Sequence, residues 1–349
     1  MGSAPDDKAG GPMFKVFDER QLAHAPALEM HNGGWTAYNE TPSRAELLRE
    51  RLGPLAPARD FGKEPLARVH TAEYLGFLEQ AYARWLAAGR EGDAVGYTWP
   101  VVRRRPLNLD RIDAQLGRFS YDAGTPITAQ TWDAAYWAAQ TALTALQPLL
   151  DGTERATFAL CRPPGHHAGA DYMGGYCYLN NAAIAARAAR DAGLERVAVL
   201  DVDYHHGNGT QDIFWEDGSV FFASIHGDPN TEYPFYWGHA DERGEGAGEG
   251  ATLNLPLPRG TTAAPYLAAL DQALAAIDAF DPGLLVISFG ADTWEQDPIS
   301  HFKLTTEDYP VLAQRIAALG RPTLIVMEGG YAVGALGDNV AGFLSGFDQ

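Results

Sequence analysis

The chain has 349 residues, of which 46% are hydrophobic and 20% are charged, so it can bury a large core and is not a disordered chain. Acidic residues outnumber basic residues by 45 to 26, and the formal charge of -19 repels phosphate groups and anionic lipids. We therefore expect no nucleic acid and no membrane among its partners.

Compartment is indicated by two further features of the sequence. No apolar run approaches the ~20 residues of a membrane span, and the N-terminal residues lack the order of a secretory signal. Cys161 and Cys177 are the two cysteines, too few for a disulfide framework. These features predict a cytoplasmic protein with two reduced, buried thiols.

Domain organisation is predicted to be simple. Residues 1–12 are small and polar, and we expect a disordered tail or a remnant of cloning there. Residues 13–349 are expected to form a single α/β domain. Within it, residues 81–125 contain Trp, Arg and Pro without clear strand order, and we interpret them as an inserted arm.

Short apolar runs are the predicted strands, and they occur at 14–17, 157–161, 197–202, 220–225, 284–289 and 323–327. Continuous apolarity without alternation is typical of parallel strands that helices cover on both faces. Ala-rich stretches at 181–192, 263–279 and 306–318 are predicted helices. This alternation of strands and helices predicts an α/β fold.

Chemically active side chains are concentrated directly after these strands. They lie in RPPGHH at 162–167, DYHH at 203–206, HGD at 226–228, GAD at 290–292 and EGGY at 328–331. Ligands of open parallel sheets bind beyond the carboxyl ends of the strands. These segments therefore predict one site at that edge of the sheet.

A metal centre is the first prediction for this site. Asp201, Asp203 and His205 end one strand, and Asp292 follows another. Buried carboxylates are costly unless they are paired or bind a cation. Asp203, His205 and Asp292 would form a three-ligand set with an open position, as in catalytic zinc sites, although the same set can hold Fe²⁺ or Co²⁺. The alternative is that these residues are helix caps and solvated acids.

Proton transfer near such a metal needs further groups. His166 and His167 lie in a stiff Pro-Pro-Gly turn and would be general bases for a metal-activated water. The alternative is a solvated histidine pair. Tyr331 follows two glycines and could stabilise an oxyanion, although a tyrosine taken alone is more often part of the core or the surface.

Five motifs together resemble the zinc-dependent histone deacetylase superfamily, and within it the bacterial acetylpolyamine amidohydrolases. They are RPPGHH at 162–167, GGYCYLNN at 174–181, DVDYHHGNGT at 201–210, GAD at 290–292 and EGGY at 328–331. The similarity runs from about residue 14 to the C-terminus. It implies an arginase/deacetylase-like three-layer fold with a single, mainly parallel eight-stranded sheet.

Residue roles follow from the resemblance position by position. It assigns zinc to Asp203, His205 and Asp292. It makes His167 the general base, His166 its electrostatic neighbour, and Tyr331 the phenol that polarises the substrate carbonyl. The resemblance pairs His166 with Asp201 and His167 with Asn208, an amide where many eukaryotic relatives have Asp. A neutral partner should leave His167 less basic than a carboxylate would.

Substrate contacts and a second ion are also implied by the resemblance. Tyr176 and Tyr233 match the aromatic walls of a narrow tunnel. The implied ligands of a structural potassium ion are Asp201, Asp203, His205 and Ser224.

In the amidohydrolases the arm dimerises, narrows the tunnel mouth and supplies acids that hold the distal ammonium groups of the substrate. Glu29 and Asp113 fall at or near two of these positions, although both could be ordinary surface acids. Gly124 stands at the third position and departs from the pattern, which Asp122 could compensate.

The sequence thus predicts a homodimeric zinc-dependent amide hydrolase that acts on small cationic acylated amines, with acetylpolyamines as the first choice. A narrow aromatic tunnel under an acidic surface suits a slender cation. One alternative is a deacetylase of acetyl-lysine side chains, and another is a hydrolase of a different small amide or ester. From another class, the chain could be an inactive sensor of polyamines or acyl groups, which would not need Tyr331.

Overall fold

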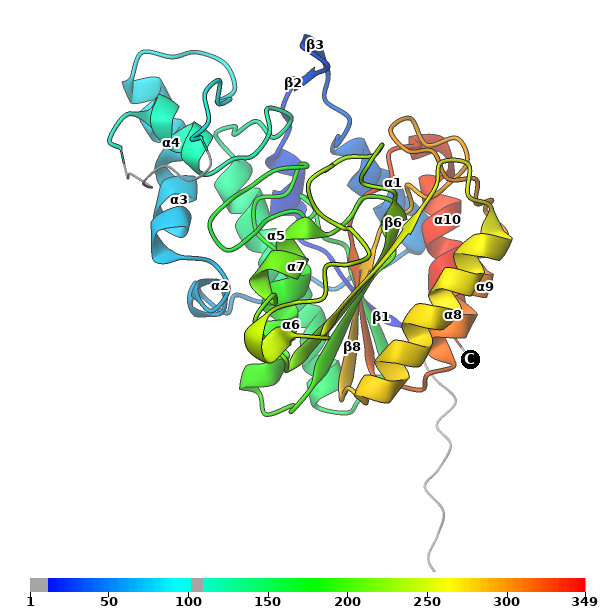
Figure 1. The fold of residues 1–349 in the computed structure, drawn as a ribbon. Coiled ribbons are helices and arrows are strands. Elements are labelled where there is room, and N and C mark those ends of the chain that lie inside the picture. The colour runs from blue at the N-terminus through cyan, green and yellow to red at the C-terminus, as the bar shows by residue number, and fades with distance from the viewer. Residues whose placement is uncertain (1–11, 102–108, 349) are drawn as a thin grey trace, which may run out of the picture.

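Seven parallel strands form one central sheet (Figure 1). The structure is a computed structural model that describes residues 12–101 and 109–348, so nearly all of the predicted tail, 1–12, lies outside the described residues. Across the sheet the strands are β1 (Phe14–Val16), β4 (Ala156–Ala159), β9 (Thr323–Met327), β8 (Leu284–Phe289), β5 (Val197–Asp201), β6 (Val220–Gly227) and β7 (Thr252–Leu257). The six predicted strands are confirmed. β7 was missed because Asn254 and Pro256 disfavour strands in general, and an edge strand tolerates them.

Helices cover both faces of the sheet, which confirms the three-layer α/β fold (Figure 1). On one face lie α5 (Thr131–Leu150) and α6 (Asn181–Asp191). On the other face lie α1 (Ser43–Leu52), α8 (Ala263–Phe280), α9 (Asp308–Ala317) and α10 (Val333–Ser345). The strands serve both layers, because alternate residues point to opposite faces: Val199 belongs to one buried cluster and Leu200 to the other.

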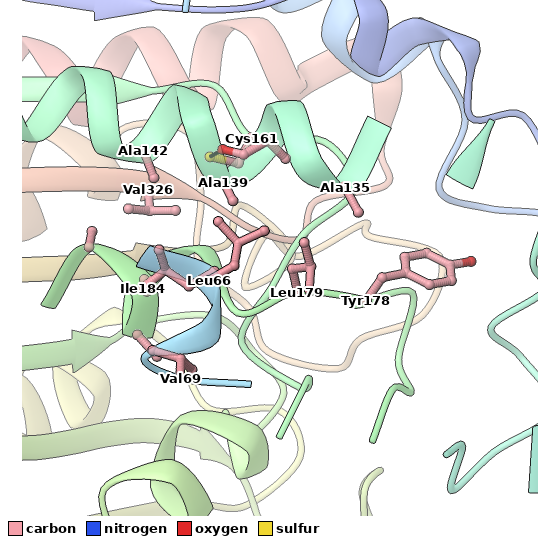
Figure 2. Close-up of a cluster of buried hydrophobic side chains, with 14 of the residues drawn as sticks. Leu66, Val69, Ala135, Ala139, Ala142, Cys161, Tyr178, Leu179, Ile184 and Val326 are labelled. Carbon is pink, nitrogen blue, oxygen red and sulfur yellow. Dashed lines mark hydrogen bonds between the residues drawn. The ribbon is translucent and has the colours of Figure 1, made fainter. Parts of the chain in front are cut away.

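Small side chains let α5 pack closely on the sheet (Figure 2). Ala135, Ala139 and Ala142 lie on one face of the helix and belong to the same buried cluster as Val326 of β9. Cys161 lies in this cluster too, and both cysteines of the chain are buried and unpaired, as expected.

The described residues give this sheet seven strands rather than the eight that the resemblance implied. Beyond β1, Val16 forms one isolated parallel bridge with Ala56, whose amide donates to the carbonyl of Lys15 at 2.8 Å. Pro54 and Pro57 flank Ala56 and have no amide hydrogen. Alternate residues face the same neighbouring strand, so Pro54 removes the donor that would extend the ladder before the bridge.

Two segments project beyond the sheet in Figure 1: the antiparallel hairpin of β2 (Leu28–His31) and β3 (Gly34–Ala37), and the region of α3 (Ala72–Ala87) and α4 (Ile112–Arg118). The predicted arm, 81–125, contains the end of α3 and all of α4, but residues 102–108 lie outside the described residues, and the arm stays a prediction. The remaining short helices are η1 (Glu19–Ala23), α2 (Glu64–Ala67), α7 (Asn208–Ile213) and η2 (Gly246–Gly248). Among the described helices, none has both the length and the apolar character that crossing a membrane demands.

Candidate active site

The three predicted metal ligands meet beyond the carboxyl ends of β5 and β8. One donor atom from each of Asp203, His205 and Asp292 lies within 4.8 Å of the other two, and all three residues are buried. Nδ1 of His205 is 3.3 Å from Oδ1 of Asp203 and 3.0 Å from Oδ2 of Asp292. The reason is topological: β5 and β8 are hydrogen-bonded neighbours, so residues nearly ninety positions apart share one edge.

Two glycines leave the room that an ion needs. A Cβ atom on Gly290 would lie 2.0 Å from Oδ2 of Asp203, and one on Gly329 would lie 2.6 Å from the same oxygen. The amide of Gly329 instead donates to this oxygen at 2.9 Å, and the amide of Tyr204 donates to Oδ1 of Asp292 at 2.9 Å. Two oriented carboxylates and an imidazole in a buried group fit a divalent cation such as zinc.

The electrostatics of the three-residue group also favour a bound cation. Burial would lower the pKa of His205, but hydrogen bonds and charges of Asp203 and Asp292 raise it to about 10. Burial, together with the charge of Asp203, raises the pKa of Asp292 to about 7. The two carboxylates therefore demand a positive charge between them, which a proton on His205 or a divalent cation can supply.

The predicted histidine pair lies beside the metal group: Nε2 of His166 is 3.8 Å from Oδ1 of Asp203, and the rings of His166 and His167 are 4.0 Å apart. Nδ1 of His166 is 3.0 Å from Oδ2 of Asp201, and Nδ1 of His167 is 2.7 Å from Oδ1 of Asn208. An amide oxygen can only accept a hydrogen bond, so Nδ1 of His167 is the donor. Its Nε2 then carries the lone pair that a general base needs.

Different surroundings give the two histidines different charges. Burial would lower the pKa of His166, but the carboxylates of Asp203 and Asp201 raise it to about 10. Burial lowers the pKa of His167 well below its usual range, and the nearby imidazoles of His166 and His205 lower it further. At neutral pH, His166 is therefore protonated and His167 is neutral.

A carboxylate from the end of β9 holds the histidine turn in place. Oε2 of Glu328 accepts the amide hydrogens of Gly165 at 2.6 Å and His166 at 3.2 Å. Burial raises the pKa of Glu328 to about 7. Its ligand atoms, with those of His166 and Cys177, form a second buried group within 4.8 Å. Glu328 lies in the EGGY motif, but no role for it could be predicted from the sequence, because its contacts are mainly to backbone amides of another segment.

Tyr331 lies at the same site with its phenol protonated. Its ring packs edge-to-face on Tyr176, with centroids 5.6 Å apart, and the guanidinium carbon of Arg44 is 4.9 Å from the ring centroid. Burial raises the pKa of Tyr331 well above its usual range. The phenol therefore keeps its hydrogen and can donate it to an acceptor.

Tyr233, the first predicted tunnel wall, lies against His167, the predicted general base. Its ring is edge-to-face with that of His167, at a centroid distance of 5.3 Å. Its hydroxyl lies 2.6 Å from the hydroxyl of Tyr121 and 2.7 Å from Oδ2 of Asp122. The same oxygen accepts from the amide of Gly175 at 2.7 Å, so Asp122 connects the segments that carry both predicted walls.

Gly124, which stands where the amidohydrolase pattern has an acid, contacts that aspartate. Its amide donates to Oδ1 of Asp122 at 3.1 Å. A negative charge is thus present two residues from the missing acid, held by three donors.

Tyr176, the second predicted wall, has an unusual backbone. Its φ of +66° is in the left-handed region, which is strained for an aromatic residue. Its amide donates to the hydroxyl of Thr125 at 3.1 Å, and its own hydroxyl donates to Oε1 of Glu29 at 3.1 Å. The strained conformation therefore sets the ring between Tyr331 and the hairpin residue Glu29.

The two acids predicted to bind substrate have different environments. Glu29, on β2, is 3% exposed, and its Oε2 is buried without a hydrogen-bond partner in the described structure. Burial raises the pKa of Glu29. The carboxylate of Asp113, on α4, lies 2.6 Å from Arg90 and 2.8 Å from Arg111, so its charge is already compensated within the chain. Oδ1 of Asp113 also lacks a hydrogen bond but lies beside Arg90, whereas Glu29 has no ion pair among the described residues and could satisfy a cationic ligand.

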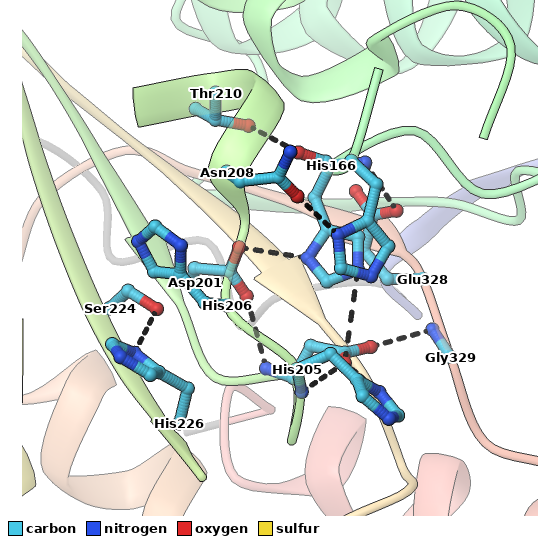
Figure 3. Close-up of polar contacts among 12 residues, drawn as sticks. His166, Asp201, His205, His206, Asn208, Thr210, Ser224, His226, Glu328 and Gly329 are labelled. Atoms are coloured by element: carbon cyan, nitrogen blue, oxygen red, sulfur yellow. Dashed lines mark hydrogen bonds and ion pairs between the residues drawn. The ribbon is translucent and has the colours of Figure 1, made fainter. Parts of the chain in front are cut away.

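The predicted potassium ligands are only partly available. Asp201 and Ser224 are partners in the register of β5 and β6, but the Ser224 hydroxyl is 2.8 Å from Nδ1 of His226 (Figure 3). Oδ1 of Asp201 accepts the amide hydrogen of Asp203 at 3.1 Å. The potassium site stays a prediction.

Fold and site define an amide-hydrolysing deacetylase, and comparison with known proteins gives the family. Residues 36–347 match the family model described as the histone deacetylase domain, so the chain belongs to this family and the resemblance seen in the sequence is confirmed.

Relatives within the family are similar over nearly the whole chain. Acetylpolyamine amidohydrolase 1 of Pseudomonas aeruginosa is 51% identical over 344 residues, covering 96% of this chain and 99% of the relative. Acetylpolyamine amidohydrolase of Mycoplana ramosa is 46% identical over 346 residues, with coverage of 96% and 99%. The crystal structure of acetylpolyamine aminohydrolase from Burkholderia pseudomallei superposes with a TM-score of 0.92 at 42% identity, covering 96% of this chain and 98% of that chain.

Proposed function

We propose that this chain is a zinc-dependent deacetylase of small cationic amines, with acetylpolyamines as preferred substrates. The observation that carries the proposal is the buried group of Asp203, His205 and Asp292 beside a neutral His167. A zinc ion held by these three ligands supplies Lewis-acid activation of water and of an amide carbonyl. Fe²⁺ and Co²⁺ suit the same donors, and metal analysis of the purified protein distinguishes them.

The histidine pair moves and balances charge during hydrolysis. His167 accepts a proton at Nε2 from the attacking water and returns it to the nitrogen of the leaving amine. Asn208 holds His167 in the required tautomer, with the hydrogen on Nδ1. His166 keeps its proton through its contact with Asp201 and stabilises the negative charge that develops nearby.

Tyr331 acts on the carbonyl of the substrate. Its phenol donates a hydrogen bond to the carbonyl oxygen as that oxygen gains negative charge, which stabilises the transition state more than the bound substrate. The burial that keeps the phenol protonated also excludes water, and the donor is therefore effective there.

Glu29 is proposed to hold the distal ammonium group of the amine. Its unpartnered, buried Oε2 needs a donor, and a substrate cation is one. Its other oxygen binds the hydroxyl of Tyr176, so the acid and the proposed tunnel wall are one unit. The formal charge of -19 adds long-range attraction for cations, and relatives named acetylpolyamine amidohydrolases support this class of amine.

A substrate comparison tests the proposal. The zinc-loaded enzyme is assayed with N-acetylputrescine and with an acetyl-lysine peptide, and we expect a higher kcat/KM for the polyamine. Glu29→Gln should raise KM for N-acetylputrescine, while Glu216→Gln, which removes the same charge from an exposed position, should not. A preference for the peptide would favour a deacetylase of acetyl-lysine side chains. Turnover of another amide or ester alone would favour a hydrolase of that different substrate. A zinc-loaded protein without any hydrolysis would favour the sensor.

The proposal includes a homodimer formed through the arm. Large apolar side chains are exposed on both sides of residues 102–108, namely Tyr97, Trp99, Val101 and Leu109. Exposed apolar groups gathered in one segment are typical of interfaces. Light scattering of the purified chain would measure the mass, and a monomer at micromolar concentration would contradict the dimer.

Two smaller proposals complete the assignment. We place the protein in the cytoplasm, where two buried free thiols stay reduced. A potassium ion near Asp201 is tested by comparing thermal stability in potassium and sodium salts of equal concentration.

A further inference from the structure

We infer that Asp297 is a positioning residue that sets the orientation of Tyr331. The inference rests on the proposed role of Tyr331 as the donor to the substrate carbonyl. Asp297 lies in the loop after β8, five residues beyond the metal ligand Asp292, and it is 7% exposed. No local sequence pattern marks it, because its contacts are to the backbone of other residues.

The carboxylate of Asp297 accepts three backbone amide hydrogens. Oδ2 accepts from Tyr331 at 2.8 Å and from Ala332 at 3.2 Å, and Oδ1 accepts from Ile299 at 3.1 Å. Ala332 precedes α10, so the carboxylate also lies at the N-terminus of that helix, where free amides and the helix dipole favour an anion. Asp297 thereby fixes the peptide of Tyr331 to the start of α10, one face of which is buried.

A cation holds the same segment from its carbonyl side. Nε of Arg44 donates to the carbonyl of Gly330 and its Nη2 to the carbonyl of Glu328, both at 2.6 Å. Gly330, whose carbonyl Arg44 binds, directly precedes the Tyr331 amide that Asp297 binds, and it has a φ of +120°. A glycine pair before Tyr331 has little conformational preference of its own. The direction of the phenol therefore depends on the charged side chains that hold the surrounding peptides.

The loop that carries Asp297 also carries a metal ligand. In the segment before α10, the amide of Gly329 donates to Oδ2 of Asp203, and the amide of Tyr331 donates to Oδ2 of Asp297. Asp292 and Asp297 thus link the metal group and the Tyr331 segment through one short loop. This connection fixes the phenol relative to the metal group, and an error of about 1 Å at such a position can lower the rate roughly 100-fold.

A competing role for Asp297 is to stabilise α10 alone. In that case its replacement would lower the melting temperature and leave the orientation of the phenol unchanged. A double-mutant cycle with Tyr331 separates the two roles, because two residues that act through one group give non-additive losses.

The primary test is Asp297→Asn in the full chain, assayed with zinc and N-acetylputrescine. Asparagine has one acceptor oxygen, so the amide pair of Tyr331 and Ala332 or the amide of Ile299 loses its partner. We expect kcat to fall roughly 10- to 100-fold with KM and zinc stoichiometry unchanged. The control is Asp308→Asn, since Asp308 also accepts a backbone amide, that of Thr305 at 2.7 Å, and its replacement should leave kcat near that of the wild type.

The cycle adds Tyr331→Phe with and without Asp297→Asn. We expect Asp297→Asn to cause less than a twofold further loss when the phenol is already absent. An equal loss in both backgrounds, or an unchanged kcat in Asp297→Asn, would overturn the inference. If Tyr331→Phe alone keeps full activity, the proposed role of Tyr331 fails, and this single variant shows it separately.

A second measurement does not need turnover. Amide hydrogen exchange in a peptide containing Tyr331 and Ala332 should be faster in Asp297→Asn than in the wild type or in Asp308→Asn. Unchanged exchange would overturn the inference. Should Asp297→Asn fail to fold, Asp297→Glu keeps the charge and lengthens the side chain, and we expect it to fold and to show the same losses.

Discussion

The side-chain oxygen of Asn208 accepts a hydrogen bond from Nδ1 of His167, with 2.7 Å between the two atoms. This contact gives the proposed general base a neutral partner, whereas its neighbour His166 has the carboxylate of Asp201. Burial lowers the pKa of His167 and no carboxylate of the described residues lies beside Nδ1 to offset it, so one imidazole is neutral and the other charged within a centroid distance of 4.0 Å.

Asn208→Asp should move the acidic limb of the kcat/KM profile to higher pH. A base works only above its own pKa, and a carboxylate beside Nδ1 would raise the pKa of His167 from its lowered position. The measurement is kcat/KM between pH 5 and pH 9, with exposed Asn230→Asp as the control. An unshifted limb in Asn208→Asp would show that His167 is not the base.

Tyr331→Phe should retain zinc but lower kcat by roughly 10² or more, the usual loss when one oxyanion donor is removed. Phenylalanine preserves the packing on Tyr176 and removes only the hydroxyl. Tyr236→Phe is a matched control, because that tyrosine is 81% exposed. Full activity in Tyr331→Phe would exclude the phenol from the reaction.

Zinc affinity should rise with pH. Metal binding must displace the proton of His205, whose pKa is about 10, so the association constant should increase about tenfold per pH unit between pH 7.5 and pH 9. Competition with a chelator measures this slope. His205→Ala should abolish tight binding, since three protein ligands form the site, whereas exposed His31→Ala should not. Stoichiometric zinc in His205→Ala would contradict the ligand set.

Gly290→Ala should prevent metal binding without replacing any ligand. Its Cβ atom would lie 2.0 Å from Oδ2 of Asp203 and would displace that carboxylate. Gly76→Ala is the control, because the new methyl group meets nothing within 4 Å and alanine favours the helix there. The measurement is the zinc content of the two purified variants. Normal zinc in Gly290→Ala would show that the metal does not bind at the Asp203 carboxylate.

Some of the structure departs from the sequence-based expectation for local reasons. Beyond β1 only the isolated bridge of Val16 with Ala56 forms, two residues after Pro54, so the expected eighth strand is absent from the described sheet. The substrate contact of Asp113 stays a prediction, and in the structure its carboxylate pairs with Arg90 and Arg111. The number of strands depends on the residues at one sheet edge, which a family pattern does not record.

Apolar runs and the polar motifs that follow them were enough to determine the parallel α/β fold, the edge that carries the site and the candidate ligands, because strand burial and strand direction are written in local residue order. Only the tertiary structure decided which acids are free and how Tyr331 is held. Glu29 keeps an unpartnered oxygen, and Asp297 and Arg44 hold the Tyr331 segment, through contacts between residues distant in the chain. Charge compensation and side-chain direction depend on distances of a few ångströms, and these arise only when the segments pack together.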